Sequence, residues 1–232
     1  MFKRKSEESL LSREREMVRM ISSLSNADLR FIIVGGYAVA TFMHRFSVDL
    51  DVVMAKSDIK IFEDILSDNN YSLKYSKELA LIYGEEFKRF EKLVNALPVN
   101  VDLLINGLVS RTTGASWSFD YILKDSRNSR LDGVEFLVPS KELLVAMKIH
   151  AGRFADIRDI VALIEDCDIE GIKKKALRGN KEKLKSVLNS GLQFLYSPSF
   201  PDSFKGVFGL QFYKEESTKK VQELLEGTIE ML

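Results

Sequence analysis

The chain contains little cysteine, little histidine and no net charge. Cys167 is the one cysteine among 232 residues, which excludes an internal disulfide framework and fits a reducing compartment. His44 and His150 are the two histidines, and neither has neighbours at the spacing of a zinc site. The 34 basic and 34 acidic residues cancel, whereas a non-specific nucleic-acid binder usually has a basic excess. Contact with nucleic acid would therefore need a local patch, and the lysine runs at 173–175 and 181–185 are more typical of solvated helix faces.

Long apolar runs are also missing. No run approaches the roughly 18 residues of a membrane-spanning helix. The basic segment 1–5 is followed by charged residues, not by the apolar core of a secretion signal. We therefore expect a cytoplasmic protein with no membrane partner. A composition of 45% hydrophobic and 29% charged residues is typical of a globular chain, long enough for one large domain or two small ones.

The spacing of apolar residues predicts an α/β part followed by a helical part. We place the boundary near Ser140, giving a domain over 1–139 with an N-terminal helix and a helical domain over 140–232. Predicted strands are 31–34, 48–54, 71–75, 79–83, 99–105 and 134–138, and 87–94 fits either a strand or a helix. Predicted helices are 8–26, 37–44, 57–67, one from Ser140, 156–166, 171–177, 181–194 and 215–232. The segments 95–98 and 196–201 are breaks, and 106–133 is loop-rich with a short helix near 119–123.

The last predicted helix carries an apolar stripe. Val221, Leu224, Leu225 and Ile229 recur at helical spacing, with Leu232 beyond them. Such a stripe packs either on its own chain or on another subunit. The sequence leaves both possibilities open.

A glycine pair stands between a predicted strand and a predicted helix. Gly35 and Gly36 follow the apolar segment 31–34 and precede the helical segment 37–44. Glycine lets a backbone approach an anion closely and adopt a positive φ. The N–H groups at the start of a helix suit phosphate oxygens. Any tight turn also explains a glycine pair, so this pair points to a phosphate site only in combination with the acidic residues after the helix.

Two carboxylates come next, at a spacing of two. Asp49 and Asp51 on a strand point to the same face of the sheet, about 6.7 Å apart, and Leu50 points to the other face. The two charges repel unless something positive lies between them, and Mg²⁺ accepts such oxygen ligands. The alternative interpretation is a solvated pair of aspartates at a strand end.

A third carboxylate, Asp102, lies within another apolar strand, where a lone charge is costly to bury. If this strand lies beside the strand of Asp49, three carboxylates converge. Phosphoryl-type transfer needs such a group, because metal ions bridge phosphate oxygens while one carboxylate helps to deprotonate the attacking hydroxyl. The alternative is a surface-facing aspartate on an edge strand.

These residues together resemble the active-site pattern of the DNA polymerase beta-like nucleotidyltransferase superfamily. The similarity covers about residues 30–165 and rests on Gly35-Gly36, the segment 47–51 and Asp102. Lys148 and Arg158-Asp159, with the Gly-Gly-Tyr-Ala segment, are most similar to the abortive-infection, type IV toxin group. The resemblance implies an α/β (α+β) fold, with a small mixed sheet flanked by helices and followed by a helical C-terminal part.

The resemblance also implies roles for individual residues. Asp49, Asp51 and Asp102 would be catalytic ligands of Mg²⁺, or of Mn²⁺, and Asp102 would also act as the base toward the acceptor hydroxyl. The implied contacts to nucleotide phosphates are Gly35, Gly36, Ser47, Arg45 and Lys148. Asp159 would match a later acidic position of the motif.

The chain also departs from the family pattern. Many superfamily members have Gly-Ser where this chain has Gly35-Gly36, so a side-chain hydroxyl is missing. Similar toxins often carry a second aspartate where Ala162 stands. Lys148 also fits a lysine that extends from an apolar helix face, and Asp159 also fits an exposed helix pair with Arg158.

The leading hypothesis is a Mg²⁺-dependent nucleotidyltransferase that binds an NTP such as ATP. It would move the NMP group to a hydroxyl of RNA, a protein or a small molecule and release pyrophosphate. A toxin of a toxin–antitoxin pair, with an antitoxin partner, is one such enzyme. The alternative is a catalytically inactive nucleotide-binding or adaptor module with the same fold. A third hypothesis, a glycosyltransferase whose Asp-x-Asp holds Mn²⁺ and a nucleotide sugar, fits the glycine pair and Asp102 less well.

Overall fold

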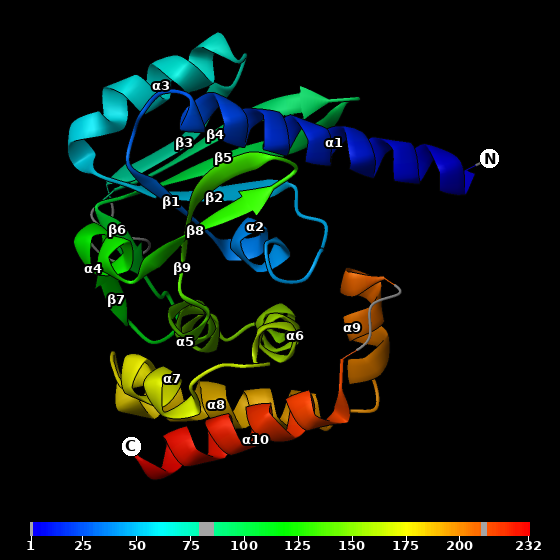
Figure 1. The fold of residues 1–232 in the computed structure, drawn as a ribbon, viewed down its shortest axis with the longest axis vertical. Coiled ribbons are helices and arrows are strands. Elements are labelled where there is room, and N and C mark those ends of the chain that lie inside the picture. Colours follow the sequence, from blue (N-terminus) through cyan, green and yellow to red (C-terminus); the bar gives the residue numbers. More distant parts are fainter. Residues whose placement is uncertain (1, 79–85, 210–212) are drawn as a thin grey trace.

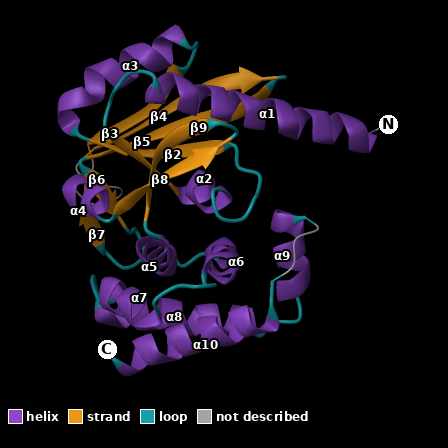
Figure 2. Ribbon diagram, viewed as in Figure 1, coloured by secondary structure: helices purple, strands orange, loops and turns teal. Residues whose placement is uncertain are grey.

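The computed structural model describes residues 2–78, 86–209 and 213–232. Within them the strands gather in one half and most helices in the other, which confirms the predicted mixed α/β fold with a helical C-terminal part (Figure 2). The first half contains α1 (Phe2–Ser25), β1 (Phe31–Val34), α2 (Gly35–Ala40), β2 (Asp49–Met54), η1 (Lys56–Asp58), α3 (Ile59–Asp68), β3 (Ser72–Glu78), β4 (Glu86–Val94), β5 (Leu97–Ile105), β6 (Gly107–Val109), β7 (Ser116–Ser118), α4 (Phe119–Lys124), β8 (Ser126–Leu131) and β9 (Val134–Pro139). The second half contains α5 (Lys141–Ala151), α6 (Phe154–Leu163), α7 (Ile169–Ala176), α8 (Lys181–Leu195), α9 (Phe200–Phe208) and α10 (Glu215–Glu230).

Seven strands of the described ranges form one mixed sheet in the order β3-β4-β5-β2-β1-β9-β8. β2 lies at its centre, antiparallel to β1 and parallel to β5. β5 is antiparallel to β4, and β4 to β3. The short strands β6 and β7 form a separate pair. The central parallel pair therefore brings residues near position 50 beside residues near position 101.

Alternation along β2 sends its side chains to two faces of the sheet. Leu50, Val52 and Met54 are fully buried in a cluster that also contains side chains of α1 and α3. Val53 packs on the opposite face, in a second cluster with side chains of α4 and α5. Figure 1 shows α1 and α3 on one side of the sheet and α5 and α6 on the side of the helical half. As predicted, Leu50 points to the face opposite that of Asp49 and Asp51, and this face belongs to the core.

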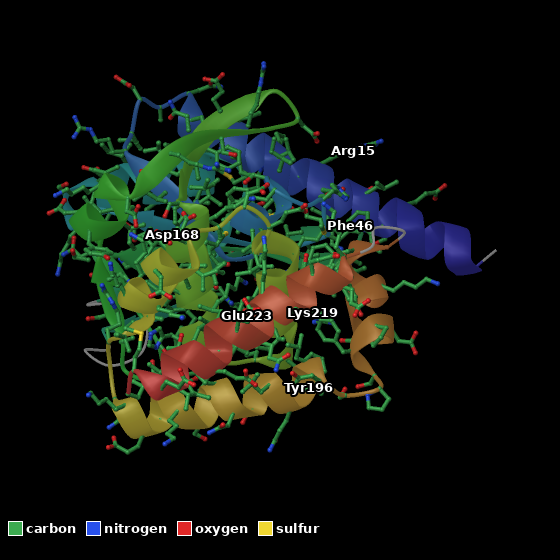
Figure 3. The ribbon with its side chains drawn as sticks, turned by 60° about the horizontal axis from the view of Figure 1, so that its bottom comes forward. Arg15, Phe46, Asp168, Tyr196, Lys219 and Glu223 are labelled. Atoms are coloured by element: carbon green, nitrogen blue, oxygen red, sulfur yellow. The ribbon has the colours of Figure 1, made fainter. Side chains whose placement is uncertain are left out.

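The helical half is a layer of α7, α8 and α10 packed below α5 and α6 (Figure 1). In the turned view of Figure 3, α10 crosses this half and carries the exposed Lys219 and Glu223. Val221, Leu224 and Leu225 of the same helix are buried in the main hydrophobic cluster. The apolar stripe thus packs on its own chain. None of the described helices is both long and apolar enough to cross a membrane.

The helix predicted from Ser140 is α5, and Ser140 caps its start. The Ser140 hydroxyl accepts a hydrogen bond from the Leu143 N–H at 3.1 Å at the start of α5. Leu144 and Ile149 of α5 belong to the same hydrophobic cluster as the strand residues Leu50 and Val101. One apolar cluster therefore runs through both halves, and a domain boundary at Ser140 stays a prediction.

The structure settles one open segment and differs from the prediction in several places, among them α2, which begins at Gly35 and ends at Ala40 instead of spanning 37–44. The ambiguous segment 87–94 is the strand β4. The loop-rich segment 106–133 contains β6, β7 and β8, and β8 gave no alternating signal because it is a polar edge strand. The predicted break at 196–201 overlaps α9, in which Pro201 occupies the first turn, where its missing N–H is tolerated. The predicted strand 79–83 lies outside the described residues.

Candidate active site

A cavity of about 450 Å³ lies between the sheet and the helices α5 and α6. Strands β2, β4 and β5 supply its sheet side, and α5, the start of α6 and the segment after β6 supply the other side. Its charged lining consists of Asp49, Asp51, Asp102, Asp156, Arg89, Arg111, Lys148 and Arg153. Its apolar lining includes Phe87, Leu104, Leu108, Leu144 and Met147. The cavity thus has charged side chains of both signs and an apolar wall.

The three predicted carboxylates all line this cavity, because β2 and β5 are parallel neighbours in matching register. Asp51 lies opposite Asp102, and Asp49 lies opposite Asn100. Residues two apart on a strand share a face, so the four positions form a square on one face of the sheet. The condition set out from the sequence, that the strand of Asp102 lies beside the strand of Asp49, is met.

Asp51 is held in an environment that disfavours its charge. Burial raises its pKa to about 7, and the negative charge of Asp102 adds to the shift, while Lys148 opposes it. A Cβ atom on Gly35 would lie 1.9 Å from Oδ2 of Asp51, so the carboxylate packs directly against the Gly35 backbone. Gly35 also has a φ of +65°, which favours glycine. Glycine is thus required at position 35 for two reasons: the positive φ of the backbone and the close contact with the Asp51 carboxylate.

Asp102 is paired with an arginine that the sequence did not single out. Arg89 on β4 lies opposite Asp102 in the register. Its Nε donates to Oδ1 of Asp102 at 2.7 Å and its Nη2 donates to Oδ2 at 2.6 Å. Asp102 is only 5% exposed. Burial raises its pKa above the usual value, and Arg89 acts in the opposite direction.

Asn100 is the fourth of these in-register positions on β2 and β5, and its side chain binds Asp49. Its Nδ2 donates to Oδ1 of Asp49 at 2.8 Å. The Asn100 side-chain oxygen is buried and has no hydrogen-bond partner among the described residues. A buried amide oxygen without a donor is uncommon in folded proteins, and a water molecule or a cation satisfies such an oxygen. Asn100 therefore holds Asp49 and offers an oxygen of its own.

Lys148 belongs to a buried chain of alternating charges. Its Nζ donates to Oδ2 of Asp159 at 2.7 Å and to Oδ1 of Asp156 at 3.1 Å. Arg45 binds Asp159 at 2.5 and 2.7 Å, and Arg153 binds Asp156 at 2.7 and 3.0 Å. Burial alone would lower the pKa of Lys148, but Asp159 and Asp156 outweigh it and raise the pKa. Lys148 is thus a charged residue whose position is fixed from both sides.

The other predicted phosphate contacts lie beside the cavity and do not line it. Gly36 faces the Ser47 side chain, whose Oγ would lie 2.7 Å from an added Cβ. Ser47 donates to the Asp49 carbonyl oxygen at 3.1 Å, and the Tyr37 hydroxyl donates to the Ser47 carbonyl oxygen at 2.9 Å. Arg45 is engaged by Asp159. These residues shape the connection into β2, and their contact with a nucleotide stays a prediction.

The donor set can be tested against a divalent cation. Within the described ranges, no three His, Cys, Asp or Glu side chains come together closely enough to hold a metal ion. Asp102 already accepts two hydrogen bonds from Arg89, whereas no donor among the described residues contacts the Asp51 carboxylate. The raised pKa of Asp51 and the partnerless Asn100 oxygen both favour a positive charge at this place. The residues therefore fit a divalent ion whose main ligands are the carboxylates of Asp49 and Asp51.

Sequence reasoning missed Arg89, Arg153 and Asp156, which line the cavity, and Asn100, which binds Asp49. Asn100 precedes Asp102 by two residues on a predicted strand, so alternation alone could have placed it on the same face. Arg89 could not be placed, because its segment also fitted a helix. Arg153 and Asp156 form a capping box at the start of α6, a pattern that the sequence shows only as an Arg-x-x-Asp spacing.

Gly35→Ala is expected to lower the free energy of unfolding by more than a glycine replacement that only strains the backbone. Gly133→Ala is the matched control, because Gly133 has a φ of +87° with open space around its Cβ position. We expect the control to lose about 1 kcal/mol of unfolding free energy and Gly35→Ala to lose at least about 1 kcal/mol more. Chemical denaturation measures both values. Equal losses would show that Asp51 does not need to pack against Gly35.

Comparison with known proteins finds distant structural likenesses. No protein-family model matches the chain, and no curated protein matches it in sequence. The solved structure of JHP933 from Helicobacter pylori is 16% identical, with a TM-score of 0.49 over 97% of this chain and 94% of that chain. ANT(2")-Ia in complex with adenylyl-2"-tobramycin is 15% identical, with a TM-score of 0.42 over 77% of this chain and 94% of its own. An antigenic nucleotidyltransferase-like protein from Paracoccidioides brasiliensis is 16% identical, with a TM-score of 0.42 over 82% of this chain and 91% of its own. Likenesses of this size leave the chemistry to be argued from this chain's own residues.

Proposed function

We propose that the chain is a metal-dependent nucleotidyltransferase that transfers an NMP group from an NTP to an acceptor hydroxyl. One observation carries the proposal: Asp49, Asp51 and Asp102 stand in register on two parallel strands and line one cavity with four cationic side chains. The motif resemblance includes the same three residues. Such a site lowers a phosphoryl-transfer barrier by positioning and charge neutralisation, without a covalent protein intermediate.

The side chains divide into three roles in this proposal. Asp49 and Asp51 would hold the divalent ion, with Asn100 fixing one oxygen of Asp49. The ion, Mg²⁺ or Mn²⁺, would neutralise phosphate charge. Asp102 would accept the proton of the acceptor hydroxyl, for which a raised pKa is suited.

The cations and the apolar wall would bind the nucleotide. Lys148 and Arg153 line the cavity next to the carboxylates and would face the triphosphate. Gly35 has no side chain that would keep a phosphate away. Arg45, Ser47 and Gly36 would hold these groups in place, and Asp159 would anchor Lys148. Phe87, Leu108 and Met147 offer an apolar surface to the nucleoside.

The proposal is tested by transfer of radiolabel from each α-labelled NTP to acceptors of three classes: RNA, protein and small hydroxyl compounds. We expect transfer that needs Mg²⁺ or Mn²⁺ and that stops in EDTA. Asp49→Asn is expected to reduce it by at least about 10²-fold, while the exposed Asp120→Asn leaves it unchanged. Transfer that persists in Asp49→Asn would reject the proposal.

A second candidate is a non-catalytic nucleotide-binding or adaptor module. The Arg89–Asp102 ion pair favours this candidate. Arg89 neutralises the third carboxylate, and such a pair is also compatible with a site that binds nucleotide but has lost its catalytic activity. Calorimetry with each NTP separates the two candidates. Nucleotide binding without label transfer to any acceptor class would favour the module.

The most specific part of the proposal is that the chain is a toxin with an antitoxin partner. Induced expression of the wild-type chain is expected to arrest growth, and Asp49→Asn is expected to relieve the arrest. Growth that is unaffected by active wild-type protein would remove the toxin assignment and leave the transferase assignment intact.

A further inference from the structure

Arg89 occupies both oxygens of a carboxylate that the proposed reaction needs. The two donated hydrogen bonds, at 2.7 and 2.6 Å, form the bidentate geometry that is the strongest for arginine and a carboxylate. Asp102 is almost completely buried, so it has little access to other partners. While this pair exists, Arg89 takes up one lone pair of each Asp102 oxygen and neutralises the charge of the carboxylate, which weakens its binding of a cation or a proton.

Arg89 is placed so that it can change partners. The Arg89 side chain is 39% exposed, whereas that of Asp102 is 6% exposed, so the arginine is the member of the pair with space to move into. Both line the same cavity as Asp49 and Asp51. A guanidinium that leaves Asp102 therefore stays within a cavity where a triphosphate would offer it new oxygens.

We infer that Arg89 couples the binding of a divalent cation to the binding of the nucleotide. This inference rests on the proposed function. Without nucleotide, Arg89 neutralises Asp102 and competes with the cation for it. With nucleotide, Arg89 moves to the phosphate oxygens and releases Asp102 to the site. Cation and nucleotide then strengthen each other's binding, and the effect is reciprocal because it is a coupling free energy.

The inference is tested with Mn²⁺ alone, measured from the loss of the free-ion signal in electron paramagnetic resonance. Arg89→Gln is expected to bind Mn²⁺ at least about tenfold more tightly than wild type, because no guanidinium competes for Asp102. Lys88→Gln is the matched control: it lies on the same strand, but its ammonium group pairs with Glu63 of α3 at 2.7 Å. The control is expected to bind Mn²⁺ as wild type does.

A second measurement adds the α,β-methylene analogue of the NTP that supports transfer, or of ATP. In wild type the analogue is expected to tighten Mn²⁺ binding, and in Arg89→Gln it is expected to tighten it at least about tenfold less. Arg89→Lys retains the charge but loses the bidentate fork, and its affinity for Mn²⁺ alone should lie between those of wild type and Arg89→Gln. It decides the question if Arg89→Gln does not fold.

The outcomes separate this inference from the proposed function. Label transfer by wild type, together with Mn²⁺ affinities that are equal in wild type and in the Arg89 variants, would overturn the coupling role and leave the transferase assignment in place. Absence of Mn²⁺ binding and of transfer in wild type and variants alike would overturn both. Tighter Mn²⁺ binding in the Arg89 variants than in wild type, with no change in Lys88→Gln, supports the inference.

Discussion

Asp51→Asn is expected to abolish nucleotidyl transfer and, at the same time, to make the metal-free protein more stable at pH 8. The transfer is lost because the variant removes a proposed ligand of the divalent ion. The stability rises because the wild-type fold raises the pKa of Asp51 to about 7 by burial and by the charge of Asp102. Above that pH the folded protein carries a charge that it disfavours, and asparagine removes it.

The pH dependence has a definite sign. Asp51 holds its proton up to about pH 7 in the folded protein, whereas an ordinary aspartate in the unfolded chain loses it near pH 4. The folded state therefore binds more protons between these values, and the unfolding free energy of wild type falls as the pH rises through this window. Asparagine does not titrate, so its advantage is absent near pH 4 and grows to about 2–4 kcal/mol at pH 8.

Chemical denaturation in EDTA at a series of pH values from 5 to 8 measures this difference. Asp120→Asn, an exposed aspartate at the start of α4, is the control and should show no such trend. Addition of Mg²⁺ should narrow the gap, since an ion that binds the folded state raises the stability of wild type alone. A variant that is no more stable than wild type at pH 8 would show that the Asp51 charge is already compensated in the metal-free fold.

Much of this site could be predicted from the sequence, because it depends on short-range rules. The spacing of two between Asp49 and Asp51 puts both carboxylates on one face and Leu50 in the core. The same alternation places Asp102 on one face with Asn100. The glycine pair marks the connection in which Gly35 adopts a positive φ. Each of these statements needs only the geometry of a strand or a turn.

The remaining part of the site depends on pairings that the sequence did not settle. β4 and β5 form a hairpin across Asn95 and Ala96, which both have a positive φ, so Arg89 lies only 13 positions from Asp102. The pair was missed because the segment 87–94 fitted a helix as well as a strand. Arg45, by contrast, lies 114 positions from its partner Asp159, and nothing local in the sequence indicates that contact. The motif resemblance therefore implied a phosphate contact for Arg45, while its ion pair with Asp159 could not be seen in the sequence.

Removal of the Lys148 charge is expected to destabilise the protein strongly. Lys148→Met leaves the buried carboxylates of Asp156 and Asp159 with one cation each instead of two. Breaking a buried charge pair from one side costs about 3–5 kcal/mol, and the remaining arginines place the expected loss at the lower end of that range. Thermal and chemical denaturation at pH 7.5 measure it. Transfer activity is expected to fall as well, but an unstable variant cannot show why.

The double variant Lys148→Met with Asp159→Asn separates structure from chemistry. It removes a cation and an anion together, so the buried network keeps its balance and most of the lost stability should return, as for other buried pairs replaced as a unit. If Lys148 faces the triphosphate, the double variant remains defective, with a raised KM for the NTP, although it is folded. Asp159→Asn alone is the matched control, because it keeps Lys148 beside Asp156. A double variant that regains both stability and the wild-type KM would show that Lys148 serves only to hold α5 and α6 together, and the phosphate contacts would then fall to Arg153 and Arg89.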